Sequence, residues 1–167
     1  MTVRNLLPIF LLAAQLVISQ STLTGLVDTN MKYAKSIYVL EETQDCSIRA
    51  LAEIYDIRYV EAREYLERWG RERETGIVAR EMLRGMHTDF PGTIEQDYLQ
   101  FRSPVTPFAF ANSVAVSGKI YLLIADRHVF VMEEVHKEEW LIKGNTDDVY
   151  TEILGYVVID LKSKEDE

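Results

Sequence analysis

The sequence has a single cysteine and no excess of positive charge. Cys46 is the only cysteine among 167 residues, so an intrachain disulfide is excluded, and its thiol is either a small buried apolar group or a reactive one. The formal net charge is −9 at pH 7. A surface of that sign repels phosphate. We therefore predict no nucleic-acid partner.

The chain also lacks an apolar run long enough to be an ordinary membrane span. The uncharged stretch 5–27 follows Arg4, and its apolar centre, residues 6–18, is shorter than the roughly 20 residues that a span needs. A charged start followed by a short apolar run is typical of a secretory signal. We predict that residues 1–30 are a signal-like leader or an anchor to a membrane or partner through residues 5–27. An ordinary helix, or an extension ahead of a start at Met31, remains an alternative.

The remainder has the composition of one small folded domain. Apolar residues make up 47% of the chain, and a single domain commonly has about 100–150 residues. We predict that residues 31–160 form this domain and that residues 161–167 form an acidic, disordered tail.

The hydrophobic period changes along this domain. It is helical in the first half and alternating or continuous in the second half. Thr106 and Pro107 carry the cap and first-position signals of a further helix. The sequence predicts helices over 46–55, 59–71, 77–86 and 106–114, and strands over 36–40, 119–124, 128–132, 140–142 and 153–161. Helices followed by strands indicate an α+β class, with N-terminal helices packed on a C-terminal antiparallel sheet.

Cys46 and His128 are the candidate chemical residues. Asp45 is a good N-cap, which places Cys46 in the first turn of a helix, where free N–H groups stabilise a thiolate. His128 begins a strand far along the chain and can supply a base. An acid after His128 would orient the imidazole, and Glu138 and Glu139 both lie in that part of the sequence. The N–H of Cys46 is a candidate oxyanion donor. We predict no metal site, because no pair of residues has zinc-ligand spacing.

Two blocks of sequence resemble a family of phage and bacterial domains that looks papain-like. The first block is D-C-S-I-R-A-L-A at residues 45–52, with Y-V-E-A at 59–62 and G-R at 70–71. The second block is S-G-K-I-Y-L-L-I and R-H-V-F-V-M within residues 117–132, followed by Trp140. In the family a G-x-Y strand precedes a G-H strand and then a D-x-W segment.

The resemblance implies a papain-like fold with Cys46 as nucleophile and His128 as base. Glu138, two residues before the tryptophan, stands where the family has aspartate, and Arg127 replaces the glycine before His128. Gln44 is a lower-ranked candidate oxyanion donor. The implied function is a cysteine hydrolase of peptidase or amidase type, phage-encoded, acting on a protein or peptide without a cofactor.

Two other functions remain open from the residues. A papain-like domain that has lost catalysis could bind a host or virion protein. Residues 47–62 also scan as a helix-turn-helix, although a DNA-reading second helix is usually basic and this one carries Glu61, Glu64 and Glu67. Localisation depends on the leader: exported or membrane-associated if it is real, and otherwise host cytoplasm or virion.

Overall fold

The computed structural model describes residues 27–28, 44–136, 139–143, 148 and 150–161. The elements in chain order are β1 (Val27–Asp28), α2 (Cys46–Tyr55), α3 (Tyr59–Arg68), α4 (Ala79–Asp89), β2 (Ile94–Val105), α5 (Pro107–Ser113), β3 (Ile120–Ala125), β4 (His128–His136), β5 (Glu139–Lys143) and β6 (Ile153–Ile159). The α+β class predicted from the sequence is confirmed, with four helices and five antiparallel strands, β2 to β6.

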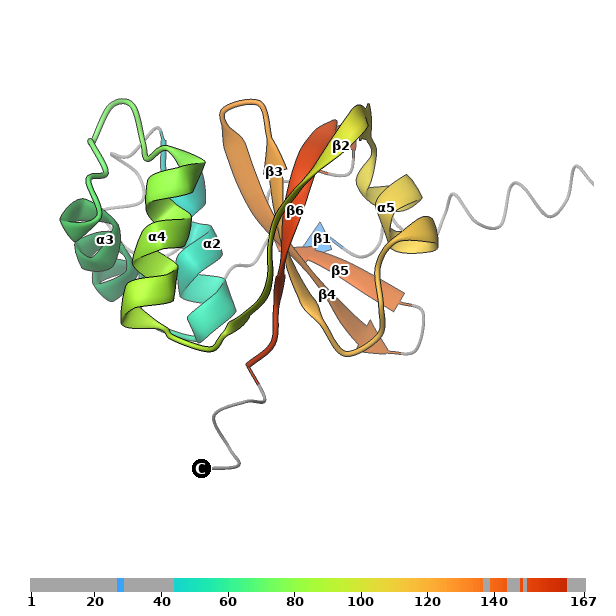
Figure 1. Ribbon diagram of the computed structural model, residues 1–167, viewed down its shortest axis with the longest axis horizontal. Helices are drawn as coiled ribbons and strands as arrows, with labels where there is room; N and C mark the ends of the chain where they lie inside the picture. The colour runs from blue at the N-terminus through green and yellow to red at the C-terminus, as the bar shows by residue number, and fades with distance from the viewer. Residues whose placement is uncertain (1–26, 29–43, 137–138, 144–147, 149, 162–167) are drawn as a thin grey trace, which may run out of the picture.

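A single sheet forms the centre of the molecule. Its strand order is β1-β5-β4-β3-β6-β2, and β1 adds a two-residue parallel pairing against β5 at one edge. Helices α2, α3 and α4 lie on one side of the sheet, and α5 lies on the other (Figure 1). The two residues of β1 fall within the predicted leader, residues 1–30, so the sheet includes a piece of chain that precedes the predicted domain.

The two faces of the sheet build separate cores. Leu122 and Ile124 of β3 pack with the buried side of α2, α3 and α4, whereas Tyr121 and Leu123 pack with Phe110 of α5. Successive side chains of a strand point to opposite faces. β3 is apolar along its whole length because both of its faces are covered, as its burial shows from residue 121 onward.

The predicted helices are present, with shifted ends. The second helix ends at Arg68 rather than residue 71, because the chain turns at Gly70 in the left-handed region, with φ 96°. The third runs over Ala79–Asp89, so the turn predicted after residue 86 is wrong by one helical turn. Thr106 caps α5 as predicted, since its hydroxyl accepts a hydrogen bond of 3.3 Å from the N–H of Ala109.

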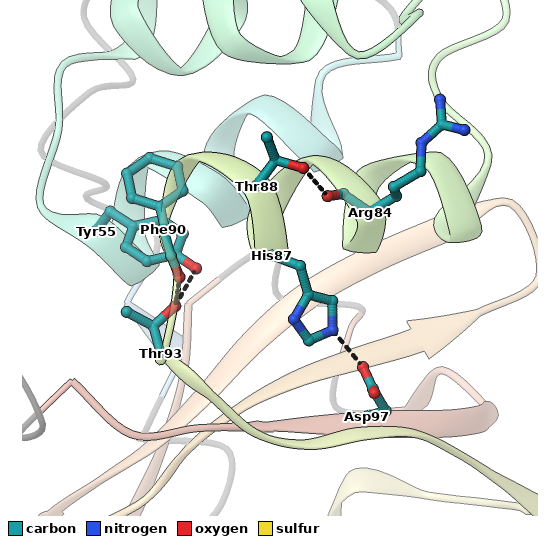
Figure 2. A network of polar contacts seen from close by, with 7 residues as sticks. All are labelled: Tyr55, Arg84, His87, Thr88, Phe90, Thr93 and Asp97. Carbon is teal, nitrogen blue, oxygen red and sulfur yellow. Dashed lines mark hydrogen bonds and ion pairs between the residues drawn. The ribbon is translucent and has the colours of Figure 1, made fainter.

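Strand β2 has no counterpart in the sequence prediction. It is an edge strand, mostly exposed, and its register against β6 shifts three times. An exposed, irregular strand leaves little alternation in the sequence. The junction between α4 and β2 is nevertheless held by side-chain hydrogen bonds. Thr93 donates to the carbonyl of Phe90 at 2.7 Å, and the hydroxyl of Tyr55 bonds to Thr93 at 2.9 Å (Figure 2).

Several predictions fall on parts of the chain outside the described residues. These are the apolar stretch 6–18, the strand 36–40 and the tail from residue 162 onward. Within the described part, no helix is both long and apolar enough to cross a membrane.

Candidate functional site

Cys46 is the first residue of α2. The amide groups at the start of a helix lack intrahelical partners and favour a negative charge. Asp45 occupies the cap position as predicted, but its side chain makes no capping hydrogen bond. Its carboxylate instead pairs with Arg49 at 2.7 Å. Arg49 thus neutralises the negative charge of Asp45, the residue that precedes Cys46 in the sequence.

His128 reaches Cys46 from the sheet. It is the first residue of β4, and it pairs with Ala125 of β3 across a two-residue turn. Arg127 in that turn has a left-handed φ of 53°. The predicted pair of adjacent antiparallel strands joined by a tight turn is confirmed. The turn places the imidazole in hydrogen-bond contact with the Cys46 thiol, so the structure brings the two predicted residues together.

Asp148 holds the other side of the imidazole. The Nε2 atom of His128 donates to Oδ1 of Asp148 at 2.9 Å, and the Asp148 side chain is only 5% exposed. Because Nε2 faces Asp148, Nδ1 is the ring nitrogen left for the thiol. The three residues therefore form a chain from thiol to imidazole to carboxylate.

Sheet topology explains why Asp148 lies there. β5 is antiparallel to β4, so its last residues lie toward the His128 end of β4. β6 then starts with Ile153 beside Ala125, the partner of His128. The connection from β5 to β6 must pass this end of the sheet, and Asp148 lies in it. In the sequence, Asp148 is one acidic residue in a connection between two predicted strands. It can be recognised as the partner of His128 only when the order of the strands in the sheet is known.

Glu138 itself lies outside the described residues. Its neighbour Glu139 pairs with His136 at the far end of β4. A strand rises about 3.3 Å per residue, so that end is roughly 26 Å from His128. Gln44 is exposed and borders the same groove as Cys46. Its backbone carbonyl accepts a hydrogen bond of 3.0 Å from the guanidinium of the buried Arg71.

The local electrostatics favour a charged thiol and imidazole pair. The hydrogen bond to Asp148, followed by that to Cys46, raises the pKa of His128 from 6.5 to about 10, although burial opposes this. Burial is also the largest single influence on Cys46 and raises the pKa of its thiol. The hydrogen bond to His128 and the backbone groups of Val129 and Ser47 outweigh it and bring that pKa below its ordinary value of 9.0. Both shifts stabilise thiolate and imidazolium together.

A groove of about 700 Å³ opens beside the pair. Its walls are the start of α2, the connection between α3 and α4, and the β3–β4 turn, which lie toward one end of the molecule (Figure 1). Its lining residues are Gln44, Cys46, Ser47, Gly70, Glu72, Glu74, Thr75, Gly76, Ile77, Val78, Ala79, Met82, Ile124, Ala125, Arg127, His128 and Val129. A thiolate at an open groove, with an oriented imidazole beside it, can attack an electrophilic carbon and can shuttle a proton.

A second concavity, of about 810 Å³, lies against α3 and has different chemistry. Glu61, Glu64 and Glu67 line it together with Arg68, and it contains neither a thiol nor an imidazole. It also shows that the outer side of the predicted second helix of a helix-turn-helix is mainly acidic, as its sequence indicates.

The described residues contain no cluster of three or more histidine, cysteine or acidic side chains that could hold a metal ion. Comparison of the chain with protein-family profiles, with curated proteins and with solved structures finds no match in any of the three.

Proposed function

We propose that this protein is a cysteine hydrolase of peptidase or amidase type, with Cys46 as nucleophile, His128 as general base and acid, and Asp148 as the residue that orients the imidazole. The observation that carries the proposal is the contact chain from Cys46 through His128 to the buried Asp148 at an open groove. The order of these residues, a cysteine at a helix start and then two residues from the sheet region, supports a papain-like arrangement.

The reaction follows from the atoms in place. The thiolate of Cys46 attacks the acyl carbon, a carbon–sulfur bond forms, and the carbonyl electrons move to the oxygen. The imidazolium of His128 then gives its proton to the departing amine as the carbon–nitrogen bond breaks. Water attacks the resulting thioester while His128 accepts its proton, and the acid product leaves with the thiol restored.

The negative oxygen needs donors that are already oriented. The N–H of Cys46 belongs to the first turn of α2, where the amide groups lack helical partners. Gln44 is an exposed residue that borders the same groove and carries a side-chain amide. We assign these two groups to the oxyanion. Asp148 fixes the ring so that Nδ1 faces the sulfur.

The decisive experiment is acylation of the full chain by p-nitrophenyl acetate, followed by mass spectrometry. We expect a burst of nitrophenolate, an acetyl group on Cys46, and its slow hydrolysis. Cys46→Ala should abolish the burst, and His128→Ala should slow both steps. His87→Ala is the matched control, because His87 also bonds an aspartate but lies away from the groove.

The result that would overturn the proposal is equally concrete. If Cys46 is acylated no faster than a free thiol, with the pH profile of a thiol of ordinary pKa, and if His128→Ala changes nothing, the pair is not catalytic. The protein would then be a binding protein that keeps the same fold, and peptide amides would remain uncleaved over any incubation.

A further inference from the structure

The wall of the groove opposite the β3–β4 turn carries carboxylates. Glu72 and Glu74 both border the groove, and both are exposed. Among the described residues, no cation forms an ion pair with either of them. The only charged side chain on the facing turn that borders the groove, apart from the His128 pair, is Arg127, which is 91% exposed and lies 3.9 Å from Asp126. The wall that carries Glu72 and Glu74 is thus negatively charged. On the β3–β4 turn, the positive charge of Arg127 is partly neutralised by Asp126.

The carboxylates stand on a well-held loop. The backbone N–H of Glu72 donates to the carbonyl of Gly76, and the reverse bond is also made, both at 2.9 Å. Gly76 has a left-handed φ of 78°, which closes this tight hairpin. The hydroxyl of Thr75 donates to the carboxylate of Glu72 at 3.0 Å. A loop held in this way presents its charges at little ordering cost to a ligand.

A second observation independently points to a ligand in this groove. Ser47 borders the groove next to Cys46 and is only 4% exposed. Its hydroxyl has no hydrogen-bond partner among the described residues. Buried hydroxyls are nearly always bonded, so a polar group of a bound substrate is the natural partner for Ser47.

From these observations we propose that the groove selects acyl substrates that carry a cationic group, of the lysyl, arginyl or free-amine type, beside the bond that Cys46 attacks. Glu72 and Glu74 bind the cation, and the hydroxyl of Ser47 bonds a polar group of the same substrate. This inference rests on the proposed function, because it names the substrate class of the same site. Anionic substrates are disfavoured by the same carboxylates.

The test compares two thiol reagents of opposite charge that share the same reactive group. Trimethylammonioethyl and sulfonatoethyl methanethiosulfonate both form a mixed disulfide with a thiolate and release methanesulfinate. Cys46 is the only cysteine, so each rate in the full chain reports on this groove. The ratio of the two rates cancels the intrinsic reactivity of the thiol. A low absolute rate would count against the proposed function, whereas the change in the ratio between variants tests the charge of the groove.

We expect the cationic reagent to react at least tenfold faster than the anionic one with the unmodified chain. Glu72→Gln/Glu74→Gln should lower that ratio by about three- to tenfold, the order of magnitude expected for two exposed carboxylates screened by water and salt. Glu64→Gln/Glu139→Gln is the matched control, because it removes the same net charge from two exposed positions away from the groove. Its ratio should change less than about twofold. Equal falls in both double variants, or no fall in either, would overturn the proposal.

Discussion

Two histidine–aspartate pairs in this molecule have nearly the same geometry and very different surroundings. His128 bonds Asp148 at 2.9 Å, and His87 bonds Asp97 at 2.7 Å, each through Nε2 and Oδ1. The Asp148 side chain is 5% exposed, whereas that of Asp97 is 73% exposed. Figure 2 shows the second pair, in which His87 points from α4 toward Asp97 on β2 with no third reactive group drawn beside it.

The comparison shows that a short hydrogen bond alone does not make a reactive site. Around His128, burial weakens solvent screening, a buried carboxylate holds one ring nitrogen, and a thiol contacts the ring. Around His87, water competes for the same bond, and exposed ion pairs contribute little. The difference between the two regions is set by what packs on each pair.

The largest expected effect comes from removing the imidazole of the buried pair. In His128→Ala, Cys46 loses its main stabilising hydrogen bond and remains buried, so its thiol pKa rises. We expect its alkylation by iodoacetamide at pH 7 to slow by about 100-fold. His87→Ala, the matched change in the exposed pair, should slow it less than twofold. Equal rates in the two variants would remove the distinction between the pairs.

The partly buried ion pairs of Lys143 test how much burial strengthens an ionic contact, measured as a change in the free energy of unfolding. Lys143 bridges Glu133 at 2.8 Å and Glu53 of α2 at 3.3 Å, and its side chain is 21% exposed. Lys143→Met leaves two carboxylates without their cation. We expect a loss of about 2 kcal/mol in the free energy of unfolding, measured by urea denaturation.

The control for that change is Arg84→Met. Arg84 pairs with Glu81 at 2.6 Å, but the Arg84 side chain is 76% exposed. We expect it to cost at most about 0.5 kcal/mol. A loss as large as that of Lys143→Met would mean that burial does not decide the strength of these contacts.

The pH dependence of thiol reactivity tests the role of Asp148. The reactive ion pair is lost as pH falls through the lowered pKa of Cys46, and imidazolium is lost as pH rises through about 10. In Asp148→Asn the hydrogen bond stays but the negative charge goes, so the pKa of His128 should fall. We expect the upper limb of the rate profile to move to lower pH and acylation near pH 9 to slow about tenfold.

Asp97→Asn supplies the comparison for that profile. It makes the same chemical change in the exposed pair, and both limbs should stay where they are in the unmodified chain. A shift of the upper limb in Asp97→Asn, or none in Asp148→Asn, would contradict the assignment of Asp148 as the orienting residue.

The smallest effect is expected for the stability of the exposed pair. His87→Ala removes a contact between α4 and β2 whose members are 46% and 73% exposed. We expect a loss of at most about 0.5 kcal/mol in thermal or urea unfolding. Phe90→Ala is the contrasting change at the same junction, because Phe90 is buried and stacks on Tyr55 at 3.8 Å. It should cost about 3 kcal/mol or more.

Local sequence signals correctly predicted the helices and strands that have a strong hydrophobic pattern or a clear capping residue. The helix that starts at Cys46, the cap at Thr106 and the paired strands before and after Arg127 all follow from short-range rules. The same rules did not find β2. An exposed edge strand with a shifting register carries no clean alternation, so only its pairing with β6 reveals it.

The sequence by itself determined that a single thiol sits at a helix start and that an imidazole begins a strand, because capping residues and hydrophobic period are local properties. Tertiary structure decided that these two groups meet, that Asp148 rather than a nearer acid contacts the ring, and that Glu72 and Glu74 face the same groove. Those facts depend on strand order and on the β5–β6 connection. Contacts between residues far apart in the chain produce no regular interval in the sequence, so they cannot be predicted from residue spacing.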